Sequence, residues 1–292
     1  MAGRTVSLAK LSCRPIGEDD LAAATQILYE GFAERPLAFW QGAIRKLATR
    51  SSPDGYPRYG YLLISDSAPV GCLLTIFAAA EPERGLGVRC SLSAHYTRAQ
   101  FRSFASLMTM RALRHKEVTY LNLTPAPQTV TMLEAHGYQR FCVGGLLIAP
   151  QLTKPSPSVT VEPFRIGGAA SEALSAVDQR ILADHADMGC ISLIAAGPDG
   201  PMPFVLQRRR VIRNLLPVTQ LIYCRQMDDF IRAAGNLGRH LGIFRAPLML
   251  VDADGPMPAL HGRMLQLPKY YKGPQRPRIG DLSYTELPIL GV

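Results

Sequence analysis

The order of turn, strand and helix signals repeats along this chain at a constant spacing. A hairpin turn is predicted at Asp66, between two β-rich runs, and a second is predicted at Gly197, which lies 131 residues later. A helix with a polar start is predicted near Thr97, and a similar helix is predicted near Asp228, also 131 residues later. Equal spacing of a hairpin, a strand and a helix predicts a duplicated fold, with chance order in an α/β protein as the alternative.

Strand and helix patterns in both halves predict the α/β class, in its mixed α+β form. Each half is expected to form a mainly antiparallel mixed sheet, flanked by helices, whose two middle strands splay apart. Prolines between residues 150 and 157 mark a linker, so we expect one domain over residues 1–153 and a second over 159–292, which ends in a tail rich in Pro, Tyr and Lys. The strands expected in the first half are 59–64, 70–77, 88–92, 118–123 and 141–148.

Composition excludes some classes of protein. Of the 292 residues, 47% are hydrophobic, which is enough apolar material to form a core. No apolar run reaches the roughly 20 residues that span a bilayer, and the start of the chain lacks the apolar stretch of a signal peptide. We therefore expect a cytoplasmic protein with no membrane span. The six cysteines occur singly and the six histidines lack zinc spacing, so we expect reduced thiols and no metal.

The formal net charge of +9 is spread along the chain. Such a surface favours anionic partners, and charge alone does not choose among a phosphate-bearing cofactor, an acidic carrier protein and nucleic acid. The densest basic run, 207–213, is either a strand edge guarded by charge or an anion site. In the tail, 267–278 mixes basic residues with two tyrosines; we expect a proline-rich loop packed on the second domain, and nucleic-acid binding is the less favoured alternative.

The elements expected within residues 12–148 follow the order strand, helix, helix, hairpin, strand, helix, strand, helix, strand. Three local segments among them are informative. They are Arg14-Pro15-Ile16 with Asp19-Asp20, the hairpin 65–71, and the stretch 120–138, in which a strand precedes a helix that ends at Gly137. On these segments, the first half resembles the GNAT superfamily of acyl-CoA-dependent N-acyltransferases. The second half resembles it in element order alone.

This resemblance implies a tandem GNAT-like fold and direct transfer of an acyl group from an acyl-CoA thioester to an amine acceptor. Acyl-CoA or CoA would be the co-substrate, with an acidic carrier protein as the alternative donor. The backbone of the strand over residues 90–94 would bind the pantetheine arm. Ser91, Leu92, Ser93 and Asn122 are therefore candidate cofactor-binding residues.

The chain departs from the family at its phosphate-binding turn. The segment 96–103 contains no glycine, and its Thr97-Arg98-Ala99-Gln100 matches a capping box instead. Arg98 and Arg102, one helical turn apart, are candidates to replace part of the glycine-rich cradle that would bind the phosphates. The alternative is a plain capped helix with two solvated arginines.

A second departure concerns the acid that would protonate the departing thiolate. The family commonly has a tyrosine four residues before the glycine that ends the last helix, and here Leu133 stands at that place. The asparagine often found earlier in that segment falls on Ala126. The remaining catalytic candidates are His95 and Tyr96, with a surface histidine as the alternative for His95. An acyltransferase is thus the leading hypothesis, and a catalytically inactive module that binds an acyl-thioester or a partner protein is the alternative.

Overall fold

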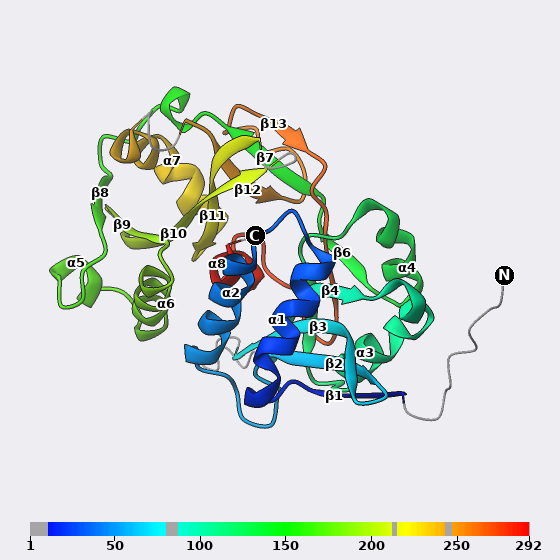
Figure 1. The fold of residues 1–292 in the computed structure, drawn as a ribbon. Coiled ribbons are helices and arrows are strands. Elements are labelled where there is room, and N and C mark those ends of the chain that lie inside the picture. Colours follow the sequence, from blue (N-terminus) through cyan, green and yellow to red (C-terminus); the bar gives the residue numbers. More distant parts are fainter. Residues whose placement is uncertain (1–10, 80–86, 212–214, 243–246, 292) are drawn as a thin grey trace. The chain divides into compact units, whose positions relative to one another are not determined.

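The structure, a computed structural model, describes residues 11–79, 87–211, 215–242 and 247–291. Its strands form two seven-stranded mixed sheets flanked by helices, which confirms the expected fold class (Figure 1). Contacts divide the chain into two compact units. Unit 1 is Met1–Asn122 with Gly273–Gln275, and unit 2 is Leu123–Lys272 with Arg276–Val292. These units follow contacts rather than chain order, so the domain boundary expected between residues 153 and 159 stays a prediction.

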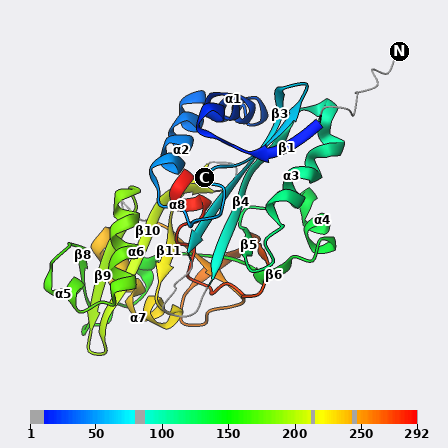
Figure 2. The same cartoon turned by 90° about the horizontal axis from the view of Figure 1, so that it is seen from below.

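Unit 1 contains five strands of the first sheet, with helices on both faces. All neighbours among these strands are antiparallel except β4 and β5, which are parallel. Apolar side chains cover both faces, since strand side chains alternate between them and β2 is buried along its whole length. Helices α1 (Leu21–Gly31) and α2 (Leu37–Thr49) lie on one face, and α3 (Ala105–Ala112) lies on the other (Figure 2). The strand order is β1 (Leu11–Pro15), β2 (Gly60–Ser65), β3 (Ala68–Ala79), β4 (Val88–Thr97) and β5 (Thr119–Asn122).

The hairpin between β2 and β3 has a tighter turn than the four residues 66–69 that the sequence suggests. Only Asp66 and Ser67 lie outside the strands, with φ angles of 48° and 68°. Two consecutive positive φ angles define a turn whose twist matches that of the flanking strands. Ala68 pairs with Ser65, and Pro69 pairs with Ile64, so both belong to the ladder.

Unit 2 contains the whole second sheet. Helix α6 (Ala176–Asp187) packs on β9 and β10, and α7 (Met227–Leu241) packs on β8 and β11. The apolar side of α7, with Phe230 and Leu237 fully buried, belongs to the main hydrophobic cluster of the unit. The strand order is β13 (Gly262–Leu265), β7 (Gly144–Ile148), β12 (Met249–Ala253), β11 (Leu216–Cys224), β10 (Gly200–Val211), β9 (Ile191–Gly197) and β8 (Thr160–Pro163). The unit also holds α4 (Val130–Ala135), α5 (Ala169–Glu172), α8 (Glu286–Leu290) and the antiparallel pair β6 (Gln139–Cys142) and β14 (Lys269–Lys272).

The strand pairing repeats between the two units. In unit 1, the parallel pair β4/β5 places Cys90 opposite Tyr120. In unit 2, the parallel pair β11/β12 places Gln220 opposite Leu250, and each of these residues lies 130 positions after its counterpart. Both longer strands, β4 and β11, continue beyond the last parallel pair. The predicted duplication and the predicted splay of the middle strands are therefore confirmed.

The predicted capping box at Thr97 is wrong. Thr97 is the last residue of β4, and a 3₁₀ turn, Ala99–Phe104, precedes α3. Arg98 occupies the N-cap without a side-chain capping bond, and its N–H donates to the carbonyl of Val70 at 2.9 Å. The local threonine–glutamine pattern is overridden because pairing with β3 extends the strand.

The single strand predicted over 141–148 is also wrong. Two strands, β6 and β7, cover this stretch, and they belong to different sheets. Val143, between them, donates its N–H to the carbonyl of Ala253 at 3.1 Å. An uninterrupted run of apolar residues therefore hid a change of sheet.

The outcomes for the tail and for the basic run differ. The tail forms strand β14 rather than a proline-rich loop, and its Tyr270 is buried with its hydroxyl donating to Glu134 at 3.1 Å. The basic run lies in β10 beyond the last pair with β9, which joins Leu206 to Ile191, so its described residues pair with β11 alone and form a strand edge, as one of the two readings of the sequence has it. Within it, Arg209 donates to the side-chain carbonyl of Gln220 at 2.8 Å. The last two positions of that run, 212 and 213, lie outside the described residues.

Lys269 and Asp252 form a buried ion pair in unit 2, with 2.7 Å between Nζ and Oδ1 and side-chain exposures of 5% and 2%. Lys269→Met leaves the carboxylate buried without its cation, so we expect the free energy of unfolding to fall by about 3–5 kcal/mol. Adding Asp252→Leu removes both charges and is expected to recover most of that loss. Urea denaturation measures both changes. As a control, Arg276→Met breaks an exposed pair and should cost less than about 1 kcal/mol; an equal loss in both single variants would contradict the prediction.

Candidate functional site

Strand β4 diverges from β5 after Ser91. The last parallel pair joins Ser91 to Leu121, and β4 runs on to Thr97. On its other edge, β4 stays paired with β3 but carries a bulge, because Ser93 and Ala94 together lie opposite the single residue Leu74. A bulge bends a strand and turns its backbone groups away from the ladder. Among the described residues, no strand pairs with β4 on the β5 side beyond Ser91.

The predicted donor-binding residues contribute mainly backbone to this edge. The hydroxyl of Ser91 is buried without a hydrogen-bond partner, and the side chain of Leu92 packs against the cluster beneath α3. Ser93 is half-buried within the bulge. Asn122 is the first residue of β5 beyond the last pair with β4, and its side chain is half-buried. The structure therefore brings these four residues to the diverging ends of two adjacent strands.

The two catalytic candidates lie on opposite faces of the sheet. His95 stands opposite Leu73, a member of the cluster beneath α3. Tyr96 faces α1, where a Cβ atom on Gly31 would lie only 2.2 Å from the ring Cγ of Tyr96. The ring of Tyr96 also makes an edge contact with Phe32, at 6.5 Å between centroids. Because neighbouring residues of a strand alternate between faces, the structure does not bring these two side chains together.

Arg98 and Arg102 differ in their environments. The guanidinium of Arg98 donates two hydrogen bonds to Glu30, at 2.9 and 3.0 Å. This bidentate pair holds the pKa of the Glu30 carboxyl below its usual range. Arg102 is exposed, with no ion pair or hydrogen bond to another described residue. An anion shared by both arginines would have to compete with Glu30 for Arg98.

The place of the missing acid is apolar, as the sequence indicates. Leu133 lies in α4 with 8% of its surface exposed, and Ala126 is the N-cap of the turn before that helix. The cysteines are free, and burial raises the thiol pKa of Cys142 to about 11 and that of Cys224 to about 12. Such thiols stay protonated near neutral pH, which disfavours them as nucleophiles.

Sequence reasoning missed a buried carboxylate in unit 2. Asp178 accepts hydrogen bonds from the hydroxyl of Tyr223 at 2.7 Å and from Arg225 at 3.0 Å. Ser175, the N-cap of α6, also donates to it at 2.8 Å and accepts from its N–H. The Ser-x-x-Asp spacing was a visible capping signal for this helix. The partners Tyr223, on β11, and Arg225, just after it, lie more than 40 residues away and were not visible in the pattern.

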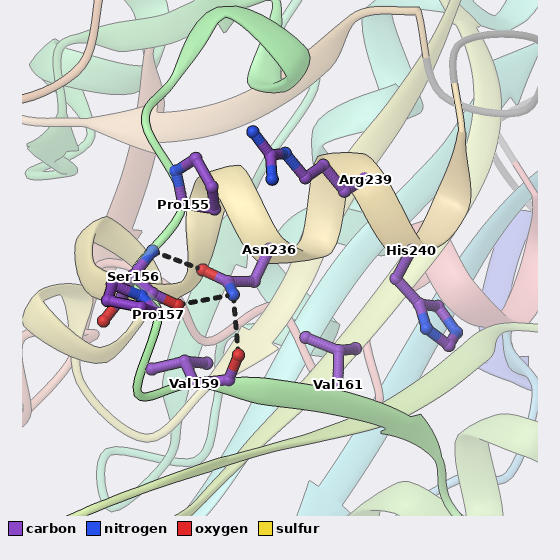
Figure 3. A pocket seen from close by; sticks show the side chains of 8 residues that line it. All are labelled: Pro155, Ser156, Pro157, Val159, Val161, Asn236, Arg239 and His240. Carbon is purple, nitrogen blue, oxygen red and sulfur yellow. Dashed lines mark hydrogen bonds between the residues drawn. The ribbon is translucent and has the colours of Figure 1, made fainter.

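A cavity of about 350 Å³ lies between the linker, β8 and α7 (Figure 3). Asn236 fastens the linker here: its side chain accepts from the N–H of Ser156 at 2.9 Å and donates to the carbonyls of Ser156 and Val159. Gly235 permits the close approach, because a Cβ atom there would lie 2.5 Å from the carbonyl oxygen of Thr153. None of the predicted site residues lines this cavity.

Across the described ranges, no group of three or more His, Cys, Asp or Glu side chains is placed to hold a metal ion. No helix in the same ranges is both long and apolar enough to cross a membrane.

No protein-family model and no curated protein matches this chain. Solved structures do. A GCN5-related N-acetyltransferase from Anabaena variabilis is similar with a TM-score of 0.57 and 9% identity, over 90% of this chain and 72% of its own. One from Kribbella flavida has a TM-score of 0.51 and 13% identity, over 89% and 70%. A glucosamine N-acetyltransferase region of a fungal multi-domain β-N-acetylglucosaminidase has a TM-score of 0.59 and 11% identity, over 91% and 38%. The chain has the fold of the GCN5-related N-acetyltransferases, present in two repeats.

His95 offers a test of the local environment. Its side chain is exposed, as the surface alternative expects, yet desolvation by neighbouring residues lowers the pKa of its imidazole, and a backbone hydrogen bond at Ala105 opposes this effect more weakly. We expect NMR titration to place the His95 midpoint below the ordinary value of about 6.5. As the pH falls below that value, the unfolded chain takes up the proton before the folded chain does, so stability decreases with falling pH. His95→Gln should remove that part of the pH dependence. A midpoint at or above 6.5 would contradict the prediction.

Proposed function

We propose that this protein is an acyltransferase that moves an acyl group from an acyl-CoA thioester to an amine acceptor, and that unit 1 binds the donor along β4. The observation that carries the proposal is the divergence of β4 from β5 after Ser91, with a bulge at Ser93 and Ala94. The similar structures named as N-acetyltransferases support the same chemistry.

The pantetheine arm suits the free edge of β4 because of its chemistry. It contains two amide groups, and an extended chain with amides can add to a strand edge through backbone hydrogen bonds. The N–H and C=O groups from Leu92 to Ala94 are the proposed partners, since β5 has turned away there. The apolar packing of Leu92 fixes the strand without filling the edge. Donor affinity is therefore expected to depend on the backbone more than on side chains.

The phosphate groups of the donor are proposed to lie near the 3₁₀ turn after β4. The first turn, from Ala99, contains no acidic residue, and N–H groups at such a start lack partners within the turn. Arg102 adds an exposed positive charge, whereas Arg98 is shared with Glu30. An acidic carrier protein that presents the same phosphopantetheine arm would use the same residues.

Arg98→Gln combined with Arg102→Gln tests this placement. Two lost cations should weaken coenzyme A binding about tenfold at low salt and reduce the salt dependence of the affinity. Arg165→Gln with Arg180→Gln removes the same charge from exposed positions in unit 2 and is the matched control. Calorimetric titration at two ionic strengths measures both. Equal coenzyme A affinities of the two double variants would contradict a role of Arg98 and Arg102 in phosphate binding.

The transfer step needs a base and an acid. The amine nitrogen attacks the thioester carbonyl carbon, a C–N bond forms, the C–S bond breaks, and the amine loses a proton while the thiolate gains one. His95 is the proposed base, because its lowered pKa keeps it neutral near pH 7. Tyr96 is the proposed acid, since Leu133 has no proton to give. Because the two residues lie on opposite faces of the sheet, at most one of them contacts the reacting atoms, and the other proton is exchanged with water.

His95→Ala and Tyr96→Phe test these roles separately. Loss of a general acid or base typically lowers turnover by roughly 100- to 10,000-fold, so we expect one variant to show a loss of this size. Thiol release from acyl-CoA compounds with candidate amines, at saturating donor, measures turnover. His115→Ala, on a histidine whose ring makes a tilted contact with Tyr56 in the same unit, is the control and should retain turnover. Wild-type turnover in both test variants would contradict the proposed roles of His95 as base and Tyr96 as acid.

A catalytically inactive module that binds an acyl-thioester or a partner protein is the second candidate. Three observations favour it: Leu133 replaces the usual tyrosine, Glu30 neutralises Arg98, and His95 and Tyr96 lie on opposite faces. A thermal-shift panel of acyl-CoA compounds separates the candidates. Stabilisation with thiol release supports the enzyme, stabilisation without it supports the module, and no stabilisation contradicts donor binding.

A further inference from the structure

In unit 2, the chain itself occupies the edge that is free in unit 1. Strand β11 diverges from β12 after Gln220, as β4 diverges from β5. The segment Arg278–Leu282 then pairs with β11: the N–H of Leu282 donates to the carbonyl of Ile222 at 2.8 Å, and the N–H of Cys224 donates to the carbonyl of Gly280 at 2.9 Å. Asp281 forms an antiparallel bridge with Tyr223.

This segment lies on the β12 side of β11. The opposite edge of β11 is taken by β10, which pairs Phe204 with Cys224 and Val205 with Tyr223. That ladder also contains an irregularity at Ile222, which matches the bulge in β4. The segment therefore follows the strand at the positions where, in unit 1, we place the donor arm.

Side chains hold the first part of the segment in place. Arg278 donates to the carbonyl of Cys224 at 2.7 Å, and its guanidinium lies over the ring of Tyr223 at 5.6 Å. Gly280 has a φ of +84°, and a Cβ atom there would lie 2.7 Å from the sulfur of Cys224. Leu282 is only 1% exposed. Glycine is thus required for the segment to approach β11 this closely.

The far end of the segment is fixed as well. Asp281 accepts hydrogen bonds from the N–H and the hydroxyl of Ser283, at 3.1 and 2.6 Å. Tyr284 donates its N–H to Nε2 of the fully buried His185 at 3.1 Å and its hydroxyl to Asp184 at 2.6 Å. The segment is therefore integrated into the core of unit 2 rather than laid on its surface.

The charge after β11 also differs from the charge after β4. Helix α7 has Asp228 and Asp229 in its first turn, whereas the turn after β4 has no acidic residue in its first turn and includes Arg102. Two carboxylates at a helix start repel phosphate groups that would otherwise be attracted there. This observation is independent of the strand pairing.

We propose that Arg278–Leu282 takes the place of a donor arm in the second repeat, so that the chain binds one acyl donor, in the first repeat. The proposal rests on the proposed function, because it uses the same placement of the arm on β4. It assigns a role to Arg278–Leu282, a segment that begins at the last residue of the basic stretch 267–278. The second repeat is a scaffold that completes its own strand edge.

Hydrogen exchange on the full-length protein tests the occupied edge without any ligand. In the free protein, the amide of Cys224 should exchange slowly because Gly280 accepts its hydrogen, whereas the amides of Ser93 and Ala94 should include fast ones. Gly280→Ala should speed exchange at Cys224 by tenfold or more. Gly189→Ala is the matched control, since Gly189 also has a left-handed φ of +86° but open space around it. Fast exchange at Cys224 in the unaltered protein would overturn the occupied edge.

Calorimetry and hydrogen exchange with acetyl-CoA test the stoichiometry. We expect one equivalent bound per chain, with new protection at Leu92–Ala94 and none at Ile222–Cys224. Two equivalents, or new protection confined to β11, would overturn the inference while leaving donor binding intact. No binding at all, with slow exchange at Cys224 retained, would overturn the proposed function instead and leave the occupied edge standing.

Discussion

Beyond Ser91, the backbone of β4 has hydrogen-bonding groups on one edge that no strand satisfies. Interior strands usually have both edges paired, since a buried N–H or C=O without a partner costs about 1–3 kcal/mol. Here β4 keeps its extended form because β3 holds the other edge and helices cover both faces of the sheet. The donor proposal and the difference between the repeats both follow from this one unsatisfied edge. In one repeat it stays available, and in the other the chain pairs with it.

The regular elements were predictable because their signals are local and periodic. The β2–β3 hairpin, the amphipathic helix α7 and the 131-residue spacing could be found without any knowledge of long-range contacts. The ends of elements were less predictable. Thr97 matches a helix cap locally, yet the hydrogen bond from Arg98 to Val70 extends the strand. The change of sheet at Val143 depends on Ala253, which is more than 100 residues away.

The position of the candidate site on β4 was predictable from the sequence, but the ion pairing of its charged side chains was not. The backbone stretch 91–93 was correctly placed at the divergence, because its position depends on strand order. Arg98 was expected beside Arg102 as a free cation, whereas its partner Glu30 lies 68 residues away on α1. The separation of His95 from Tyr96 could have been anticipated, since adjacent residues of a strand point to opposite faces. The pairing of Arg278–Leu282 with β11 carried no periodic sequence signal, because its ladder is made by backbone groups.

Strand β7 precedes the linker in the chain, yet it lies between β12 and β13 in the second sheet. A fragment beginning at residue 159 would lack an interior strand and would leave β12 and β13 without their shared partner, and unpaired strand edges favour aggregation through strand pairing. The order of the strands in the second sheet thus differs from their order along the chain. Because a strand that precedes the linker lies inside the second sheet, cutting the chain at the linker does not give two fragments that each contain a complete sheet.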